Sequence, residues 1–305
     1  MELTTFNKSL DKSFSFRNID TDNNVKYSSF IDLFAGIGGF HIALHSLGLE
    51  CVFASEYDVH ARKTYEANFK KLNPSLFKNS NFAGDITKVV PKNIPDFDIL
   101  CAGFPCQPFS QAGFKRGFDE ERGTLFFYIA KIIKEKRPKA FFLENVRHLL
   151  NHDEGKTLRT IKQIMKNELG YSFHYKIVKA SDFGLPQHRP RLFMVGFRDI
   201  KNFEFPKPTK LKLTMSDIFA AKCEKEIGYT LRVGGRGSKI TDRRNWDSYL
   251  VDGKVKQLSP TEALKMQGFP EDYVFPVSNT QAMKQLGNSI AIPAVKAVAA
   301  SILKH

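Results

Sequence analysis

Cysteine is scarce in this sequence, with only four among 305 residues. Cys51, Cys101, Cys106 and Cys223 form no C-x-x-C pair, and no histidine lies near them at zinc-finger spacing. The pattern argues against a disulfide scaffold and against a structural zinc site. We therefore expect a protein that needs no metal.

Long apolar runs are also missing. No apolar run approaches the roughly 18 residues that a membrane helix requires. Residues 1–28 form a polar arm without the apolar centre of a signal peptide. These absences predict a protein with no membrane partner, located in the cytoplasm.

Acidic residues are in deficit: 32 Asp and Glu stand against 46 Lys and Arg, for a net charge of +14. Such a balance favours a polyanionic partner, nucleic acid before membrane, because neutralising phosphates releases counterions. A lysine-rich proteome would give the same number. Charge alone therefore leaves the partner open.

Short apolar segments alternate with helical patterns from residue 29 to residue 197. Strands are predicted at residues 29–36, 50–56, 96–104, 140–146, 171–181 and 191–197, and helices at residues 39–49, 59–72, 123–137 and 155–170. This alternation predicts an α/β fold, with a mostly parallel sheet and helices on both faces. Ligands of such sheets bind beyond the carboxyl ends of the strands.

The alternation stops after Phe197. Residues 198–257 hold 14 Lys and Arg against 8 Asp and Glu, and they include the glycine-rich basic run TLRVGGRGSKITDRRNW. We expect a small, basic, mainly β or irregular domain here. The last residues, NSIAIPAVKAVAASILK, predict a helix apolar enough to dock back onto the large domain.

A glycine-rich turn, DLFAGIGG, follows the first predicted strand at residues 32–39. Its G-x-G-G spacing lacks the dinucleotide fingerprint and suits a nucleotide-like ligand without a pyrophosphate, although a plain tight turn explains it equally well. Glu56, about 20 positions further on, is placed for ribose hydroxyls, and Asp85 for an adenine amino group. Each acid could instead cap a helix, but together with the turn they favour an adenosyl ligand.

Cys106 lies just beyond the strand predicted at residues 96–104, where ligands bind. Pro105 and Pro108 on either side favour an exposed loop over a packed helix. Most cysteines are inert and buried, but Cys101, on the strand itself, is the better candidate for packing. Cys106 is therefore the candidate nucleophile.

Partners for a thiolate come from other strand ends. Glu144 and Asn145 lie near the end of another strand, at the same edge of the predicted sheet, and the run QHRPR supplies Arg189 and Arg191. A thiolate can add to an electron-poor ring carbon while the glutamate donates to a ring nitrogen, and the neighbouring carbon then attacks a methyl sulfonium. His188 would allow a Cys/His protease dyad, but no oxyanion motif accompanies it.

These segments closely resemble the DNA (cytosine-5-)-methyltransferase family. The resemblance runs in family order from residue 30 to about residue 300, and it rests on the motifs DLFAGIGGF, ASEYD, GDIT, GFPCQPFS, RGTLFF, ENV, QHRPR, EALKMQGFPEDY and QLGNSI. It implies a Rossmann-like S-adenosyl-methionine-dependent methyltransferase fold with a target-recognition domain. The implied division is residues 1–28 as the arm, 29–196 as the catalytic and cofactor-binding domain, 197–287 as the target-recognition domain and hinge, and 288–305 as the C-terminal helix.

The resemblance implies a catalytic role for each matching residue. Cys106 would attack C6 of a cytosine flipped out of the duplex. Glu144 would contact N3 and the exocyclic amine, and Arg191 would bind the base O2 and brace Glu144. Gln187 and Arg189 would support the pocket.

It also implies a site for S-adenosyl-methionine, with S-adenosyl-homocysteine as product. Glu56 would bind the ribose, Tyr57 would lie against the adenine and Asp85 would hold its amino group. The full implied set is Phe34, Ala35, Gly36, Ile37, Gly39, Glu56, Tyr57, Asp85, Ile86, Pro105, Leu125, Asn288 and Ser289.

Double-stranded DNA is the implied partner. The loop at residues 107–122 would close over the flipped base, and the expected DNA contacts are Gln107, Ser110, Arg232, Arg236, Lys239, Arg243 and Arg244. The resemblance further implies a monomer that associates with the nucleoid and works beside a restriction endonuclease acting on the same site.

Three alternative functions fit these residues less well. The branch of the family that methylates tRNA carries a Cys-Phe-Thr signature, whereas here Cys223 is followed by Glu224. A catalytically silent DNA-binding protein would not need Cys106, Glu144 and Arg191 together. A nicotinamide oxidoreductase would need the pyrophosphate glycine spacing.

Overall fold

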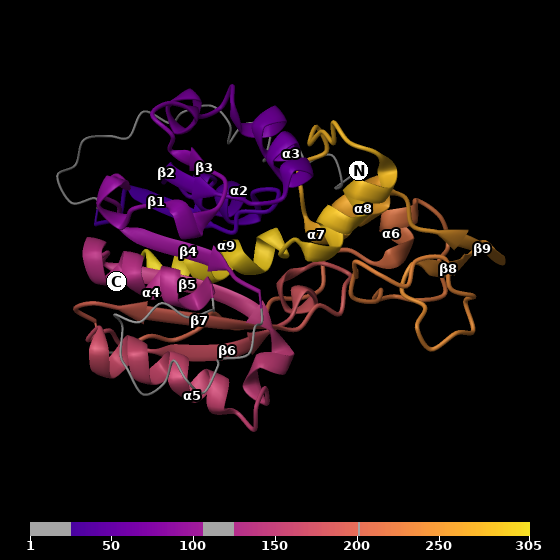
Figure 1. The fold of residues 1–305 in the computed structure, drawn as a ribbon. Helices are drawn as coiled ribbons and strands as arrows, with labels where there is room; N and C mark the ends of the chain where they lie inside the picture. The colour runs from indigo at the N-terminus through magenta and orange to yellow at the C-terminus, as the bar shows by residue number, and fades with distance from the viewer. Residues whose placement is uncertain (1–25, 106–124, 201) are drawn as a thin grey trace.

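The structure is a computed structural model that describes residues 26–105, 125–200 and 202–305 (Figure 1). Its main body is a seven-stranded sheet in the order β3-β2-β1-β4-β5-β7-β6. The strands are β1 (Ser29–Leu33), β2 (Glu50–Ser55), β3 (Phe82–Ala83), β4 (Ile99–Gly103), β5 (Ala140–Val146), β6 (His174–Val178) and β7 (Arg191–Phe197). The six strands predicted from the apolar runs are confirmed, because each run is long enough for a strand and too short for a buried helix.

The sheet is parallel from β3 to β5, and β7 is antiparallel to both β5 and β6. In the ladder between β5 and β7, Val146 at the end of one strand pairs with Arg191 at the start of the other. The start of β7 therefore lies at the same edge as the carboxyl ends of the parallel strands. This edge is called the rim below.

Helices cover both faces of the sheet, which confirms the predicted α/β layers. One apolar cluster joins the sheet to α2 (Gly39–His45), α3 (Val59–Phe69) and α9 (Ile292–Ile302). The other joins it to α4 (Leu125–Lys136) and α5 (Lys156–Gln163). Shorter helical turns lie at Pro74–Phe77, Ile86–Lys88, Pro91–Asn93, Arg147–Leu150 and Ala180–Phe183, with a π-helical turn at Ile164–Glu168.

A smaller lobe follows β7 and lies beside the sheet in Figure 1. Its regular elements among the described residues are α6 (Met215–Phe219) and the hairpin of β8 (Ser248–Val251) and β9 (Lys254–Gln257). The two residues of the hairpin turn, Asp252 and Gly253, both have positive φ, which matches the right-handed twist of the strands. Much of the rest is irregular chain around the buried Trp246.

The chain then returns to the sheet through α7 (Pro260–Gln267), α8 (Asn279–Asn288) and α9. The hydroxyl of Tyr273 donates to the carbonyl of Ile37 at 2.6 Å. Gly39 begins α2, and a Cβ on Gly39 would lie 2.5 Å from Ile290, so a larger residue would not fit. The returning segment thus supports the glycine-rich turn. None of the helices in the described part of the chain is long and apolar enough to cross a membrane.

Candidate active site

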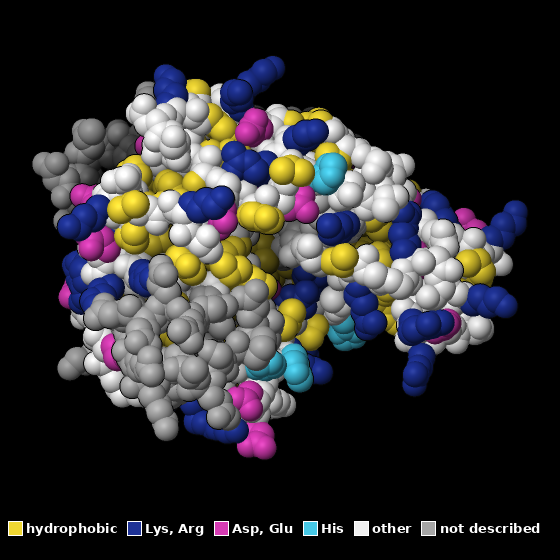
Figure 2. Space-filling model, in the orientation of Figure 1, with side chains coloured by type: hydrophobic (Ala, Val, Ile, Leu, Met, Phe, Trp, Pro, Cys, Tyr) yellow, Lys and Arg dark blue, Asp and Glu magenta, His cyan; other side chains and the backbone are white. Residues whose placement is uncertain are grey.

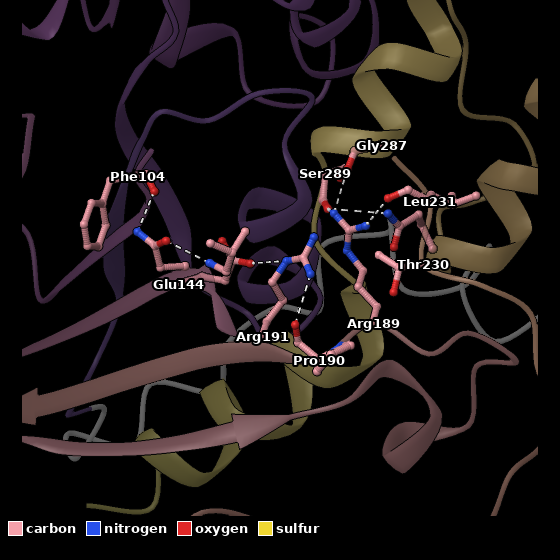
Figure 3. Close-up of polar contacts among 12 residues, drawn as sticks. Phe104, Glu144, Arg189, Pro190, Arg191, Thr230, Leu231, Gly287 and Ser289 are labelled. Atoms are coloured by element: carbon pink, nitrogen blue, oxygen red, sulfur yellow. Dashed lines mark hydrogen bonds and ion pairs between the residues drawn. The ribbon is translucent and has the colours of Figure 1, made fainter. Parts of the chain in front are cut away.

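A carboxylate and a guanidinium meet at the rim. Glu144, near the end of β5, forms an ion pair with Arg191 at the start of β7, with 3.0 Å between Oε1 and Nε (Figure 3). The ladder places Val146 opposite Arg191, and side chains repeat every two residues, so Glu144 and Arg191 share one face of the sheet. Gly103, the last residue of β4, pairs with Glu144 in the ladder and leaves room beside its carboxylate.

Burial sets the chemistry of this carboxyl group. Glu144 is buried, which raises its pKa, while the positive charges of Arg191 and Arg189 act in the opposite direction. The side chain therefore holds a proton to higher pH than an ordinary glutamate. Such a group can act as a general acid and is also a candidate for binding a polar ring edge.

Asn145 fixes the exit of the neighbouring strand. Its Nδ2 donates to the carbonyl of Phe104 at 2.9 Å, and its Oδ1 accepts from the N–H of Val146 at 2.8 Å (Figure 3). The amide thereby ties the end of β5 to the chain leaving β4, just before Pro105. The sequence had given Asn145 no role of its own, and its place beside Glu144 was the only signal.

The predicted nucleophile, Cys106, lies outside the described residues, as do Gln107, Ser110 and the predicted closing loop at residues 107–122. Pro105, which precedes Cys106 in the chain, is exposed and comes two residues after the end of β4. The roles of these residues stay predictions.

Gln187 and Arg189 are fully buried and bond to backbone groups rather than to Glu144 or Arg191. Arg189 donates to the carbonyls of Leu231, Gly287 and Ser289 (Figure 3). Gln187 donates to the carbonyl of Met266 at 2.9 Å and accepts from the N–H of Leu231 at 3.1 Å. Their side chains hold backbone segments of the returning chain, so any effect on the site acts through position.

The glycine-rich turn has one open position. Phe34, Gly36 and Gly38 all have positive φ. A Cβ on Gly38 would collide with Phe69, whereas a Cβ on Gly36 would have none of the described atoms within 4 Å. Gly38 is therefore required by packing, and Gly36 faces space that a ligand can use.

Glu56 binds the backbone of this turn. Its Oε2 accepts from the N–H of Gly36 at 2.7 Å, and its Oε1 accepts from the N–H of Asp58 at 2.7 Å. Burial raises the pKa of Glu56, and these two hydrogen bonds act in the opposite direction. The carboxylate is thus held rigidly at the end of β2 and keeps further lone pairs for a ligand.

The other predicted cofactor residues differ in how exposed they are. Tyr57 follows Glu56 and is 77% exposed, an unusual position for an aromatic ring. Ala35, Ile37 and Ile86 are buried, Phe34 and Leu125 are half-buried, and Asn288 is exposed beside the buried Ser289. Asp85 is half-buried and accepts from the N–H and hydroxyl of Thr87, as a helix cap does, so its role toward adenine stays a prediction.

The five predicted DNA contacts of the smaller lobe are exposed, and basic side chains are visible over this lobe in Figure 2, but the five are not equivalent. Arg236 donates to the carbonyl of Leu258 at 3.0 Å and pairs with the buried Asp247 at 3.6 Å. Arg244 pairs with Asp242 at 2.8 Å. The remaining predicted DNA contacts in this lobe are Arg232, Lys239 and Arg243.

The chain matches the family described as C-5 cytosine-specific DNA methylase over residues 28–234 and 228–304. Type II methyltransferase M.HhaI of Haemophilus parahaemolyticus is 42% identical over 315 residues, covering 90% of this chain and 93% of the relative. Type II methyltransferase M.HpaII of Haemophilus parainfluenzae is 42% identical over 328 residues, covering 90% and 89%.

Solved structures give the same fold. A DNMT2 mutant from Spodoptera frugiperda aligns with a TM-score of 0.67 at 19% identity, covering 91% of this chain and all of that one. The Dnmt2 methyltransferase of S. pombe aligns with a TM-score of 0.65 at 17% identity, covering 90% and 98%. At these identities the likeness establishes the Rossmann-like architecture and nothing finer.

Proposed function

This chain belongs to the C-5 cytosine-specific DNA methylase family and is a DNA (cytosine-5-)-methyltransferase, and we propose that it works by covalent addition of Cys106 to C6 of a flipped-out cytosine. Its relatives named above are type II methyltransferases. We propose that it modifies one specific site in double-stranded DNA, as the partner of a restriction endonuclease.

The observation that carries the proposal is the ion pair between the buried Glu144 and the half-buried Arg191 at the rim, next to the chain that leads into Cys106. A buried carboxyl group with a raised pKa can deliver a proton to N3 of cytosine. The guanidinium beside it offers donors to the base O2 while it holds the carboxyl group in place.

The proposed sequence of steps balances protons and electrons. The thiolate of Cys106 forms a bond to C6 as Glu144 passes its proton to N3, which makes C5 nucleophilic. C5 would then take a methyl group from the sulfonium of bound S-adenosyl-methionine, and the carbon–sulfur bond that breaks would leave neutral S-adenosyl-homocysteine. Removal of the C5 proton by a base or water restores the ring, the bond from sulfur to C6 breaks, and the proton on N3 returns to Glu144.

The residues around the glycine-rich turn fit S-adenosyl-methionine, which when bound supplies an electrophilic methyl group on a sulfonium. Gly36 leaves open space, Glu56 offers lone pairs to ribose hydroxyls, and the exposed ring of Tyr57 offers a face for adenine. Ser289, whose hydroxyl lies 3.5 Å from where a Cβ on Gly39 would be, completes the turn at the methionine end. The described residues hold no cluster of three or more His, Cys, Asp or Glu suited to a metal ion.

We further propose that residues 197–287 form the target-recognition domain and hinge, and that the enzyme acts as a monomer. The exposed residues Arg232, Lys239 and Arg243 have the charge to contact phosphates or base edges. Residues 29–196 would then hold the chemistry, and residues 288–305 would close the cofactor site.

The proposed activity can be tested by bisulfite sequencing. Plasmid DNA from cells that express the chain should carry protected cytosines at one short recurring sequence, and DNA from cells expressing a Glu144→Gln variant should not. Protection at no site, or at cytosines of unrelated sequence, would contradict a site-specific cytosine-5 methyltransferase.

A Gly36→Ala variant should bind S-adenosyl-methionine at least about tenfold more weakly. The added methyl group would occupy the open space above the turn, and the positive φ of Gly36 adds strain of roughly 1 kcal/mol. Isothermal titration calorimetry would measure the change. Gly48→Ala is the matched control, because Gly48 also has positive φ and open space but lies in the turn between α2 and β2. Equal loss of affinity in both variants would assign the effect to backbone strain.

A further inference from the structure

Arg189 is one of the largest fully buried side chains described in this protein. Its Nη1 donates to the carbonyl of Leu231 at 3.0 Å, and its Nη2 donates to the carbonyls of Gly287, at 2.9 Å, and Ser289 (Figure 3). These acceptors lie 42, 98 and 100 residues further along the chain. One guanidinium therefore joins two distant backbone segments.

The charge of Arg189 is met by these carbonyls, and no ion pair links it to a carboxylate among the described residues. Burial lowers its pKa, the charge of Arg191 acts in the same direction, and the negative charge of Glu144 acts against both. Arginine stays protonated under such conditions, so the charge remains. Burying this charge costs free energy. The hydrogen bonds from the planar guanidinium offset that cost only while all three carbonyls stay in place.

Leu231 is held at both of its backbone groups. Gln187 accepts from its N–H, and Arg189 donates to its carbonyl. On the other side, Gln267 donates to the carbonyl of Leu286 at 2.8 Å. A Cβ on Gly287 would lie 2.5 Å from the carbonyl oxygen of Arg232, so the two segments touch backbone to backbone. Neither segment can shift without disturbing the other.

The two segments belong to different parts of the proposed site. Leu231 precedes Arg232, the first of the predicted DNA contacts in the smaller lobe. The hydroxyl of Ser289 lies 3.5 Å from where a Cβ on Gly39 would be, at the proposed methionine end of the cofactor site. We propose that Arg189 is a positioning residue that couples DNA binding by the smaller lobe to cofactor binding at the glycine-rich turn. The inference rests on the proposed function and adds to it a cooperative link between its two substrates.

The coupling follows from the shared hydrogen bonds. When a ligand fixes residues 287–289, Arg189 fixes Leu231 as well, so the second ligand meets a segment that is already ordered. Linkage requires the effect to be reciprocal: each ligand must raise the affinity of the other by the same factor. Measured couplings of this kind are usually about 5- to 150-fold.

The test uses the full chain, S-adenosyl-homocysteine to prevent turnover, and a fluorescent duplex carrying the site identified by bisulfite sequencing. Fluorescence anisotropy gives the DNA Kd with and without S-adenosyl-homocysteine. We expect the ratio of the DNA Kd without S-adenosyl-homocysteine to the DNA Kd with it to be about five or more in wild type. In Arg189→Lys the ratio should fall to near one, because an ammonium cannot reproduce the planar fork toward three carbonyls.

Arg236→Lys is the matched control. Arg236 also bonds a backbone carbonyl, that of Leu258, but it does not reach residues 287–289. Its DNA affinity should fall equally in both cofactor states, leaving the ratio intact. A Gly287→Ala variant forces the segments apart while the Arg189 side chain itself is kept. Its ratio should also fall to near one.

The wild-type protein alone can overturn the inference. A ratio of one in wild type would refute the coupling, and this measurement does not depend on any variant folding. A full wild-type ratio in Arg189→Lys would also refute it. Methylation of plasmid DNA by a wild type without coupling would refute the coupling and leave the proposed function standing. Absence of methylation would instead refute the proposed function.

Discussion

A Cys106→Ala variant should lose methyl transfer by a factor on the order of 10⁴ or more, which is the scale seen when enzymes lose a covalent nucleophile. Cytosine C5 is a poor nucleophile until a group adds to C6, and water is a much weaker nucleophile for that addition than a thiolate. DNA binding should survive, because only one thiol is removed. Transfer from radiolabelled S-adenosyl-methionine measures the rate, and electrophoretic mobility measures binding.

Cys223→Ala is the control for this loss. Cys223 is buried in the smaller lobe and has no place in the proposed chemistry, so its variant should methylate at close to the wild-type rate. Normal turnover by Cys106→Ala would end the assignment of the nucleophile.

A covalent adduct gives a direct view of the same step. On DNA with 5-fluorocytosine at the target position, fluorine replaces the proton that must leave, so the bond from sulfur to C6 should persist. Mass spectrometry of the digested complex should place the adduct on the peptide that contains Cys106. An adduct on another peptide would move the nucleophile elsewhere.

Replacing Glu144 with glutamine should lower kcat by about 10²- to 10⁴-fold, the usual contribution of a general acid. The amide still forms hydrogen bonds, but it has no proton to transfer to N3. In wild type, burial raises the pKa of Glu144, so the protonated fraction, and with it the contribution of this residue, declines as pH rises through that raised value. Single-turnover rates across pH should show this decline in wild type and not in Glu144→Gln.

The same pKa shift has a consequence for folding stability. A carboxyl group whose pKa is raised in the folded state contributes most stability below its unfolded pKa, about 4.3, and loses it as pH rises through the folded value. Thermal unfolding at several pH values should show that slope in wild type and a flatter one in Glu144→Gln. Glu154→Gln is the matched control, because Glu154 is an exposed surface carboxylate.

The layered α/β fold could be predicted because its signals are local. Apolar runs such as residues 140–146 specify buried strands, and their alternation with helices specifies a sheet covered on both faces. The direction of β7 could not be predicted, since an apolar run reads the same in a parallel or an antiparallel strand. Yet this direction brings Arg191 to the rim beside Glu144.

The roles of Gln187 and Arg189 could not be derived from sequence spacing. They occupy one short motif with Arg191, but their acceptors include Leu231 and Ser289, far along the chain. Asp85 shows a different limit: a carboxylate before a helical turn suits both a cap and a ligand, and only coordinates reveal its bonds to Thr87. Local patterns give the elements, whereas contacts between distant segments need the folded chain.

The position of α9 matters for how the protein is made. This helix follows every strand of the sheet in the chain and so leaves the ribosome after them, yet it packs in the interior against α2, beside the glycine-rich turn at residues 32–39 (Figure 1, yellow). Until it and the preceding Ile290 emerge, part of one apolar face of the sheet stays uncovered and the turn lacks the support of Ile290. Nascent chains should therefore stay inactive until α9 has emerged, so that termination before this helix yields products that chaperones and proteases recognise rather than enzymes that mark DNA.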